Sequence, residues 1–243
     1  MKIGLLECDH VAERYQEIGG DYRDMFAALL ARHAPGVTLQ SFDVCNGQWP
    51  GAADHCDSWI CTGSRFSVYD DVEWIHRLKS FVRQLRETRQ PFVGICFGHQ
   101  ILAEVFGGHV ARAPAGWGVG VHRMELIHPE PWMQPLQSGV NLQFMHQDQV
   151  LRLPPGARLL ANSDHCPIAM FRVDDTMLGI QAHPEFPREY SDALLVDRAE
   201  RIGVERAHAA RESLIWDTEE DIATSWIREF LRTALGFRTR KLA

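Results

Sequence analysis

One short stretch of the chain, Gly94–Gln100, constrains the fold more than any other, because it joins a strand to a helix through a single cysteine. The apolar run 91–95 before it has the features of a buried strand, and the apolar segment 101–106 after it continues as a helix. Cys96 is therefore expected at the amino end of a helix, where unpaired N–H groups favour the nucleophilic thiolate. The pattern G-x-C-x-G predicts a nucleophile elbow that carries a thiol, although alone it also fits a structural cysteine in a tight turn.

Predicted strands and helices alternate along the chain, which indicates an α/β fold: an open, mostly parallel sheet with helices on both faces. The alternating elements are strands over 2–7, 37–43, 57–61 and 91–95 and helices over 21–33 and 72–85. From about 108 to 145, Pro and Gly separate shorter extended segments, which predicts an antiparallel extension flanking the main sheet. Two later strands, over 167–173 and 177–182, precede a helical tail that begins near Pro187.

We expect one catalytic domain over 1–190 and a helical C-terminal extension over 191–243 that packs on the same domain. The net charge of −7 disfavours nucleic acid as a partner, and no apolar run is long enough to span a bilayer. The amino-terminal residues do not have the pattern of a signal peptide. The six cysteines lack zinc-site spacing, so we expect free thiols in a reducing cytoplasm, with no metal and no cofactor.

A thiol nucleophile needs a base, and the tripeptide His-Pro-Glu, which occurs twice, supplies a histidine together with a carboxylate that can orient it. His183 and Glu185 follow the mostly apolar run 177–182, which suits a central strand buried on both faces. Because active sites of open α/β sheets lie at the carboxyl ends of central parallel strands, position favours this copy and predicts a Cys-His-Glu triad with Cys96. The copy at His128 is interpreted as a polar turn punctuated by proline.

A third element must stabilise the oxyanion that forms when a carbonyl group is attacked. The segment Trp59–Ser64 runs from an apolar strand into a glycine turn, and such a loop can direct a backbone N–H into a site. Together, the N–H groups of Gly63 and Phe97 would form an oxyanion hole with two donors. Thr-Gly-Ser is a weak signal by itself, so this expectation depends on the elbow and on His183.

These segments together resemble the class I glutamine amidotransferases, whose glutaminase domains carry a G-x-C-x-G-H-Q elbow and a later His-Pro-Glu. The resemblance extends from Met1 to about Phe186. The loop around Gly63, with Ser67-Val68-Tyr69, is similar to the oxyanion loop of GMP synthetase glutaminase domains. The family has a flavodoxin-like fold, so the resemblance implies that fold here.

The resemblance assigns Cys96 as the nucleophile, His183 as the acid–base and Glu185 as the group that orients it. It also implies that residues around the elbow hold a small-molecule γ-glutamyl substrate. These residues are Ser64, Tyr69, Gln100, His146 and Gln147. The implied reaction is hydrolysis of a γ-glutamyl amide, either glutamine or a γ-glutamyl conjugate, through a γ-glutamyl thioester on Cys96.

Two enzymatic interpretations remain open. About fifty residues follow Glu185, too few for the ATP-dependent synthetase domain of GMP synthetase-like enzymes, and the chain contains no P-loop. Either the protein acts alone, like the similar stand-alone γ-glutamyl peptidases, or it is a glutaminase subunit that delivers ammonia to a separate synthetase chain. Thr62–Arg65 in place of the common Gly-Gly-Pro, and the long helical tail, favour the stand-alone hydrolase. A non-catalytic regulatory homologue is disfavoured because the triad is complete.

Overall fold

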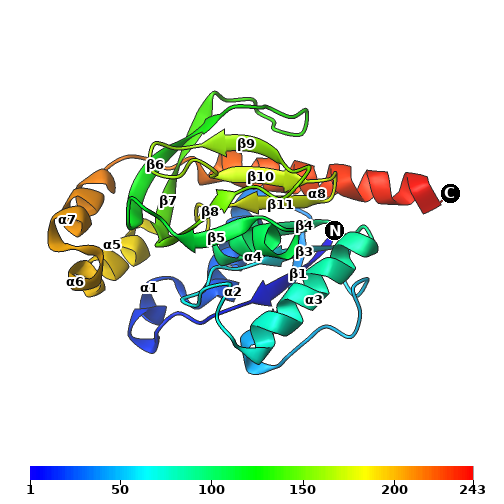
Figure 1. Cartoon of the computed structure of the whole chain (residues 1–243), viewed down its shortest axis with the longest axis horizontal. Coiled ribbons are helices and arrows are strands. Elements are labelled where there is room, and N and C mark those ends of the chain that lie inside the picture. Colours follow the sequence, from blue (N-terminus) through cyan, green and yellow to red (C-terminus); the bar gives the residue numbers. More distant parts are fainter. Residues whose placement is uncertain (243) are drawn as a thin grey trace.

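A nine-stranded sheet forms the centre of the molecule in the computed structural model, which describes residues 1–242 and the side chains of residues 1–237 (Figure 1). Its strand order is β2-β1-β3-β4-β11-β10-β9-β6-β7. Five neighbouring strands run parallel: β2 (Thr38–Asp43), β1 (Lys2–Glu7), β3 (Ser58–Cys61), β4 (Phe92–Ile95) and β11 (Met177–Ile180). The predicted α/β architecture, an open and mostly parallel sheet with helices on both faces, is confirmed.

The predicted antiparallel extension is present, and its strands continue the main sheet: β10 pairs with β11 and places Met170 opposite Ile180. The continuing strands are β10 (Met170–Val173), β9 (Arg158–Asn162), β6 (Gly118–Leu126) and β7 (Gly139–His146). A separate two-stranded sheet is formed by β5 (His109–Arg112) and β8 (Asp148–Arg152). Extended segments are visible in a sequence, but the partner of each strand is set by tertiary packing.

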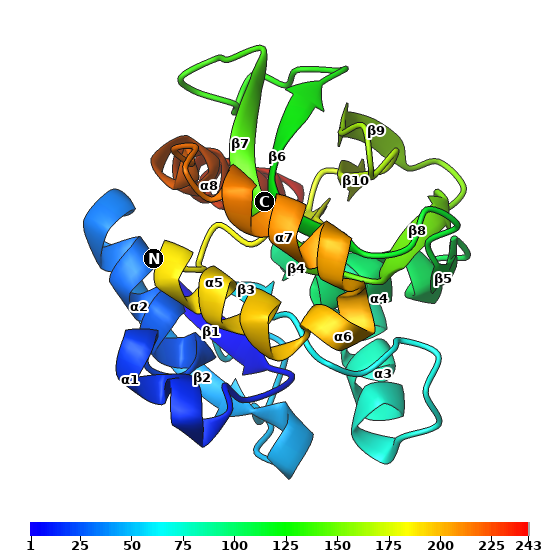
Figure 2. The same cartoon turned by 90° about the vertical axis from the view of Figure 1, so that its left-hand side faces the viewer.

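Helices cover both faces of the parallel half (Figure 1, Figure 2). One face carries α2 (Tyr22–His33) and α8 (Glu220–Leu242), and the other carries α3 (Glu73–Glu87) and α4 (Phe97–Val105). Phe26 and Trp226 pack in the core of the first face together with Leu5, while Leu78 packs near Trp59 on the second. Strands covered on both sides are expected to be apolar, and the central strands β3, β4 and β11 are buried along their whole length, whereas the edge strand β2 is partly exposed and more polar.

The predicted helices at 21–33 and 72–85 are present, and local chemistry explains where they begin. Asp21 caps α2: its side chain accepts from the N–H of Tyr22, and the Asp24 side chain accepts from the N–H of Asp21 in a capping box. In α3 the buried residues recur at helical spacing and turn one apolar stripe toward the sheet. They are Ile75, Leu78, Phe81, Val82 and Leu85.

The C-terminal part of the chain is helical, as predicted, and covers the far end of the sheet (Figure 2). Three helices follow β11 and precede α8: α5 (Arg188–Asp197), α6 (Ala199–Ile202) and α7 (Val204–Ser213). Val119 and Val121 of β6 form an apolar cluster there with Leu195 and Ala210. Residue 243, the last of the expected extension 191–243, lies outside the described residues. Shorter helical turns are η1 (Glu13–Tyr15), α1 (Gln16–Gly19) and η2 (Val44–Asn46).

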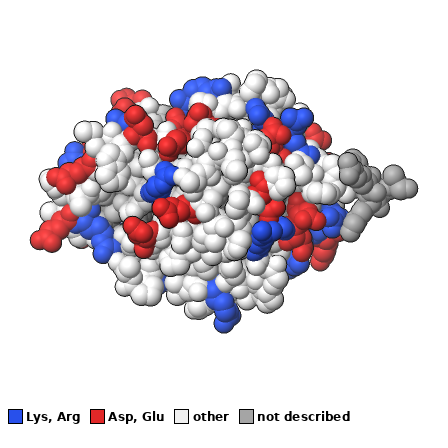
Figure 3. Space-filling view, turned by 90° about the horizontal axis from the view of Figure 1, so that it is seen from above, with Lys and Arg blue, Asp and Glu red and all other residues white. Residues whose placement is uncertain are grey.

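None of the helices within residues 1–242 is both long and apolar enough to cross a bilayer. On the face seen in Figure 3, acidic and basic side chains lie interspersed. Mixed charge of this kind gives no strong field of one sign on that face.

Candidate active site

Three adjacent parallel strands bring the predicted site together. β3, β4 and β11 pair side by side, so their carboxyl ends meet at one edge of the sheet. The loop with Gly63 follows β3, Cys96 follows β4, and His183 follows β11. Ligand and active sites of open α/β sheets lie at this edge. The three segments are far apart in sequence, and the order of the strands in the sheet makes them neighbours.

Cys96 has the backbone of a nucleophile elbow. It is the N-cap of α4, with φ of 50° and ψ of −96°, a conformation that residues other than glycine rarely adopt. The flanking glycines make the turn feasible: a Cβ on Gly94 would lie 2.2 Å from the carbonyl of Gly98, and a Cβ on Gly98 would lie 2.7 Å from the carbonyl oxygen of Cys61. The thiol is thus held at the end of a strand, at the start of a helix and almost entirely buried.

His183 and Glu185 form a buried pair beside the cysteine. The Nδ1 of His183 lies 2.8 Å from Oε1 of Glu185, and the two side chains are 3% and 0% exposed. Burial lowers the pKa of His183, but the charge of Glu185 and the neighbouring Cys96 outweigh it and raise the pKa to about 10. The bond at Nδ1 leaves Nε2 as the nitrogen that can exchange a proton with a substrate. Phe186 stacks on the imidazole at 3.9 Å and fixes its plane.

The loop after β3 closes over this pair. A Cβ built on Gly63 would lie 2.8 Å from Cε1 of His183 and 3.6 Å from Cβ of Cys96, so the backbone there touches both residues. Among the described residues, neither the N–H of Gly63 nor the N–H of Phe97 donates a hydrogen bond. Two unpaired donors beside a buried thiol are the arrangement that an oxyanion hole needs.

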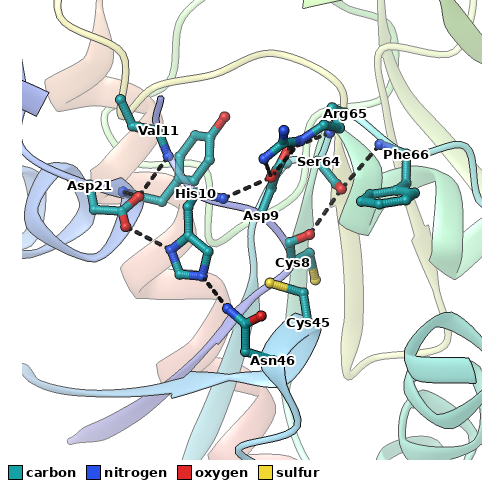
Figure 4. A network of polar contacts seen from close by, with 12 residues as sticks. Cys8, Asp9, His10, Val11, Asp21, Cys45, Asn46, Ser64, Arg65 and Phe66 are labelled. Atoms are coloured by element: carbon teal, nitrogen blue, oxygen red, sulfur yellow. Dashed lines mark hydrogen bonds and ion pairs between the residues drawn. The ribbon is translucent and has the colours of Figure 1, made fainter. Parts of the chain in front are cut away.

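The end of β1 holds that loop in place (Figure 4). The buried carboxylate of Asp9 accepts from the backbone N–H of Arg65 at 2.8 Å and from its guanidinium. The hydroxyl group of Ser64 donates to the carbonyl oxygen of Cys8 at 2.9 Å. The oxygen of that hydroxyl group also accepts a hydrogen bond from the backbone N–H of Phe66. These bonds fix the loop that carries Gly63, so the site does not have to order it when a substrate binds.

A small cleft of about 100 Å³ opens onto Cys96. It is lined by most of the predicted substrate-binding residues: Ser64, Gln100, His146 and Gln147. Tyr69 does not line the cleft itself but donates its hydroxyl to Oδ1 of Asp148, which does, at 3.0 Å. Ser67 donates to the other oxygen of the same carboxylate. The cleft is therefore polar, and the hydroxyl groups of Ser67 and Tyr69 orient the Asp148 carboxylate that lines it.

Gln100 and His146 are buried side chains that form part of the wall of the cleft. Nε2 of Gln100 donates to the backbone oxygen of Asp148 at 2.7 Å and to Oε1 of Gln181 at 3.1 Å. Burial, and then the charge of His165, lower the pKa of His146 well below its usual value, so the imidazole is neutral. Both residues shape the wall of the cleft, and whether they touch substrate stays a prediction.

Within the described part of the chain, one cluster of potential metal ligands occurs, away from Cys96. Donor atoms of His10, Asp43 and Cys45 lie within 4.8 Å of one another near the ends of β1 and β2. Each already has a protein partner: Nδ1 of His10 bonds Asp21 at 2.7 Å (Figure 4), and Sγ of Cys45 bonds Asp43 at 3.3 Å. Their mutual bonds account for the cluster without an ion.

Several cleft residues escape sequence reasoning. Arg112 lies at the end of β5, Trp117 precedes β6, and Arg198 and Arg201 come from the C-terminal helices. No motif or spacing connects these positions with the elbow, because tertiary packing alone brings them together. Asp148 is the exception: it directly follows the predicted site residues His146 and Gln147, and an acidic side chain at that place in the sequence is a signal that could have found it.

Fold and site first define a class: an α/β protein with a cysteine at a strand-to-helix elbow and a histidine–carboxylate pair beside it. The glutamine amidotransferase class I family matches residues 57–199. The chain belongs to this family, and like its relatives it is a hydrolase-type enzyme.

Relatives of two kinds are similar to the chain. Gamma-glutamyl peptidase 4 of Arabidopsis thaliana is 32% identical over 190 residues, which cover 75% of this chain and 73% of the relative. A glutamine-hydrolyzing GMP synthase subunit of Sulfurisphaera tokodaii is 34% identical over 165 residues, 68% and 78% of the two chains. The relatives thus include both γ-glutamyl peptidases and a synthase subunit.

Solved structures confirm the fold. A glutamine amidotransferase from Thermotoga maritima superposes with a TM-score of 0.74 at 16% identity, covering 97% of this chain and 98% of the other. A glutamine amidotransferase from Methylobacillus flagellatus gives a TM-score of 0.70 at 21% identity, over 98% and 94% of the two chains. The likeness extends over nearly the whole chain and includes the C-terminal helices.

Proposed function

We propose that the protein hydrolyses a γ-glutamyl amide bond by covalent catalysis on Cys96. The observation that carries this proposal is the convergence of three elements at one sheet edge: the strained elbow thiol, the buried His183–Glu185 pair and two unpaired backbone N–H groups. The names of the gamma-glutamyl peptidase relatives, about 30% identical over most of their length, support the γ-glutamyl specificity.

The first half of the reaction forms a thioester. The thiolate of Cys96 attacks the γ-carbonyl carbon, and the N–H groups of Gly63 and Phe97 stabilise the resulting oxyanion. The oxyanion collapses as the C–N bond breaks, and Nε2 of His183 gives its proton to the departing amine. A high pKa suits this step, because a protonated His183 is then present at neutral pH.

The second half releases glutamate. His183, now neutral, takes a proton from water, and the hydroxide attacks the thioester carbonyl in the same oxyanion hole. The C–S bond breaks, Cys96 leaves as the thiolate, and the imidazolium is restored. Glu185 keeps the proton on Nδ1 throughout and stabilises the charged form of the ring.

The experiment that tests this proposal is glutamate release by the purified protein from glutamine and from a panel of γ-glutamyl amides, with Cys96→Ala as the control. Rapid quenching and mass spectrometry of the intact protein should show a γ-glutamyl adduct on the wild-type chain and none on Cys96→Ala. Undiminished turnover by Cys96→Ala would refute the assignment.

A second function is favoured by the relatives that are GMP synthase subunits: a glutaminase that delivers ammonia to a synthetase chain in trans. The two functions differ in a simple observable. A stand-alone hydrolase turns over at full rate by itself, whereas a glutaminase of this kind is silent on every amide while its Cys96 still reacts with a thiol probe.

We also propose that the helical extension beyond residue 190 packs on the catalytic domain 1–190 and that the protein works in the cytoplasm. Leu195 of α5 and Ala210 of α7 share one apolar cluster with β6, which supports the first point. All six cysteines are free, including Cys8 and Cys61 with their sulfur atoms 3.4 Å apart, which suits a reducing compartment.

A further inference from the structure

A second cavity adjoins the cleft at Cys96. The cleft has a volume of about 100 Å³, while its neighbour has about 360 Å³ and lies between the end of β1, η1 and α5. Arg65, Arg198 and Arg201 line both, so their side chains form the boundary between the two spaces. A substrate whose γ-carbonyl group lies at Cys96 can extend its amine half past these three arginines into the larger cavity.

The charges around this boundary do not balance. Arg65 is paired with Asp9, and Arg14 on the far wall is paired with Asp197 at 2.8 Å. Arg198 and Arg201, in contrast, have no carboxylate within 4.0 Å among the described residues. The boundary therefore carries two positive charges that no carboxylate neutralises, and an incoming anion would form an ion pair with both arginines.

The surroundings fix the backbone of Arg198 and the guanidinium of Arg201, which is otherwise exposed. Arg198 is half-buried at the end of α5, where its N–H bonds the carbonyl of Leu194 at 3.0 Å. The guanidinium of Arg201 lies over the ring of Trp117, 5.1 Å from its centre. Stacking of this kind fixes the plane of the guanidinium but leaves its N–H donors free for a carboxylate.

Apart from the charged pair Arg14–Asp197, one part of the larger cavity is aromatic and can contact an apolar side chain. Tyr15, Tyr22 and Tyr190 line it together with Leu194. Burial raises the pKa values of Tyr22 and Tyr190, so their phenols are neutral and add no negative charge near the arginines. A volume of this size falls in the range of small-molecule sites.

The glutamyl half of the substrate does not require these arginines. Its α-carboxylate can bind Arg112, which lines the smaller cleft and has no carboxylate partner within 4.0 Å among the described side chains. Arg198 and Arg201 face the other cavity as well, and free ammonia, the product of glutamine hydrolysis, would leave that cavity unused.

We propose that Arg198 and Arg201 bind a carboxylate on the amine half of the substrate, so that the protein selects γ-glutamyl amino acids or short γ-glutamyl peptides over glutamine and over γ-glutamyl amines. This inference rests on the proposed γ-glutamyl hydrolysis. Arginine is suited to the task because its planar fork binds carboxylates through paired, charge-assisted hydrogen bonds. Both side chains come from the C-terminal helices, which gives this part of the chain a role in specificity.

The test uses three substrates with the same leucine-like side chain that differ in one group of the amine half: a carboxylate in γ-glutamyl-leucine, a neutral carboxamide in γ-glutamyl-leucinamide and a hydrogen atom in γ-glutamyl-isopentylamine. We expect kcat/KM for the acid to exceed that for the amide and the amine by about 10- to 100-fold, the usual effect of charge-assisted hydrogen bonds. The double variant Arg198→Gln/Arg201→Gln should bring the acid-to-amide ratio close to one. Arg211→Gln is the matched control, since Arg211 pairs with Asp192 on the surface and lines neither cavity; it should keep the ratio.

The outcomes separate this inference from the proposed function. Hydrolysis of acid and amide at equal rates, or a ratio that survives in the double variant, would overturn the inference and leave γ-glutamyl hydrolysis standing. Failure to cleave any of the three, together with failure to cleave glutamine, would overturn the proposed function. Calorimetric titration of the inactive Cys96→Ala protein with γ-glutamyl-leucine and γ-glutamyl-leucinamide then still tests the carboxylate site. Tighter binding of the acid, abolished when Arg198→Gln and Arg201→Gln are added, supports the inference. Equal binding of acid and amide refutes it.

Discussion

His128-Pro129-Glu130 and His183-Pro184-Glu185 have identical sequences, yet the histidine bonds the glutamate only in the second. His183 is 3% exposed and lies 2.8 Å from Glu185. His128 is exposed and bonds the backbone oxygen of Leu159 instead, at 2.9 Å. Glu130 accepts from two arginines, Arg172 and Arg158. The same three residues thus form a buried acid–base pair in one place and a surface turn in the other.

The direction of the preceding strand explains the difference. β11 runs parallel to β4, so its carboxyl end lies beside Cys96. β10, β9 and β6 follow in the sheet, each antiparallel to the one before, so β6 runs opposite to β11. The residues after β6, which begin the copy at His128, therefore lie at the opposite edge of the sheet from the thiol. Position in the sheet, and not the tripeptide, makes the histidine available for catalysis.

Alanine at each histidine should separate the two copies most strongly. His183→Ala removes the only acid–base group proposed for Cys96, and we expect kcat/KM for γ-glutamyl hydrolysis to fall by about 10⁴-fold. His128→Ala should stay within about twofold of the wild type, as is usual for a surface change away from a site. Initial rates of glutamate release measure both, with thermal melting to verify folding. Equal losses in the two variants would contradict the comparison.

The glutamates should differ next most. Glu185→Gln removes the charge that orients His183, and we expect kcat/KM to fall by about 100-fold. The same charge helps raise the pKa of His183 to about 10. Since protonated His183 donates to the leaving amine, activity should be lost as pH rises through that value, and this alkaline limb should move to lower pH in Glu185→Gln. A pH–rate profile from pH 6 to 10.5 tests the shift, and an unmoved limb would refute the role of the carboxylate.

His183, unlike His128, lies against the loop that carries Gly63. A methyl group added at Gly63 should therefore disturb the position of the His183 imidazole. Gly63→Ala would place a Cβ 2.8 Å from the imidazole, so the loop or the ring must move, and we expect kcat to fall by about 10-fold or more. Gly51→Ala is a suitable control, because nothing lies within 4 Å of the added atom. Steady-state kinetics of both variants measure this loss. A wild-type kcat in Gly63→Ala would show that the close contact between Gly63 and His183 does not contribute to catalysis.

The smallest effect is expected at the other glutamate. Glu130→Gln weakens the ion pairs with Arg158 and Arg172, and we expect the free energy of unfolding to fall by about 0.5–1 kcal/mol with no change in kcat/KM. Urea denaturation measures the first quantity and glutamate release the second. A change in the alkaline limb of the pH–rate profile would show that the two copies are not independent.

The sequence predicts most of what lies on the parallel half of the sheet. The elbow at Cys96 and the choice of His183 over His128 depend on local patterns: glycines at a strand end, and a continuous apolar run before the tripeptide. Such patterns survive folding because they reflect buried strands and tight turns. Position 63 was predictable for the same reason, as a glycine directly after an apolar strand.

Long-range packing limits what could be foreseen. The pairing of β6 with β9, which places Leu126 opposite Ala161, follows from tertiary packing, which alternating segments do not encode. Likewise, Arg198 and Arg201 stand in a polar helical region where a charged residue is ordinarily on a solvated face. They border the cleft only because α5 and α6 fold back over the end of the sheet.

The backbone at Cys96 has a consequence for anyone who engineers this enzyme. With φ at 50°, the position has a conformation that glycine adopts freely and that costs other residues about 1–3 kcal/mol. Exchanging the nucleophile for glycine would relieve that strain, so the fold itself does not favour the cysteine. A laboratory selection for thermal stability alone would not select against the replacement of Cys96 by glycine. Inactive variants would then accumulate unless catalytic turnover is screened in every round.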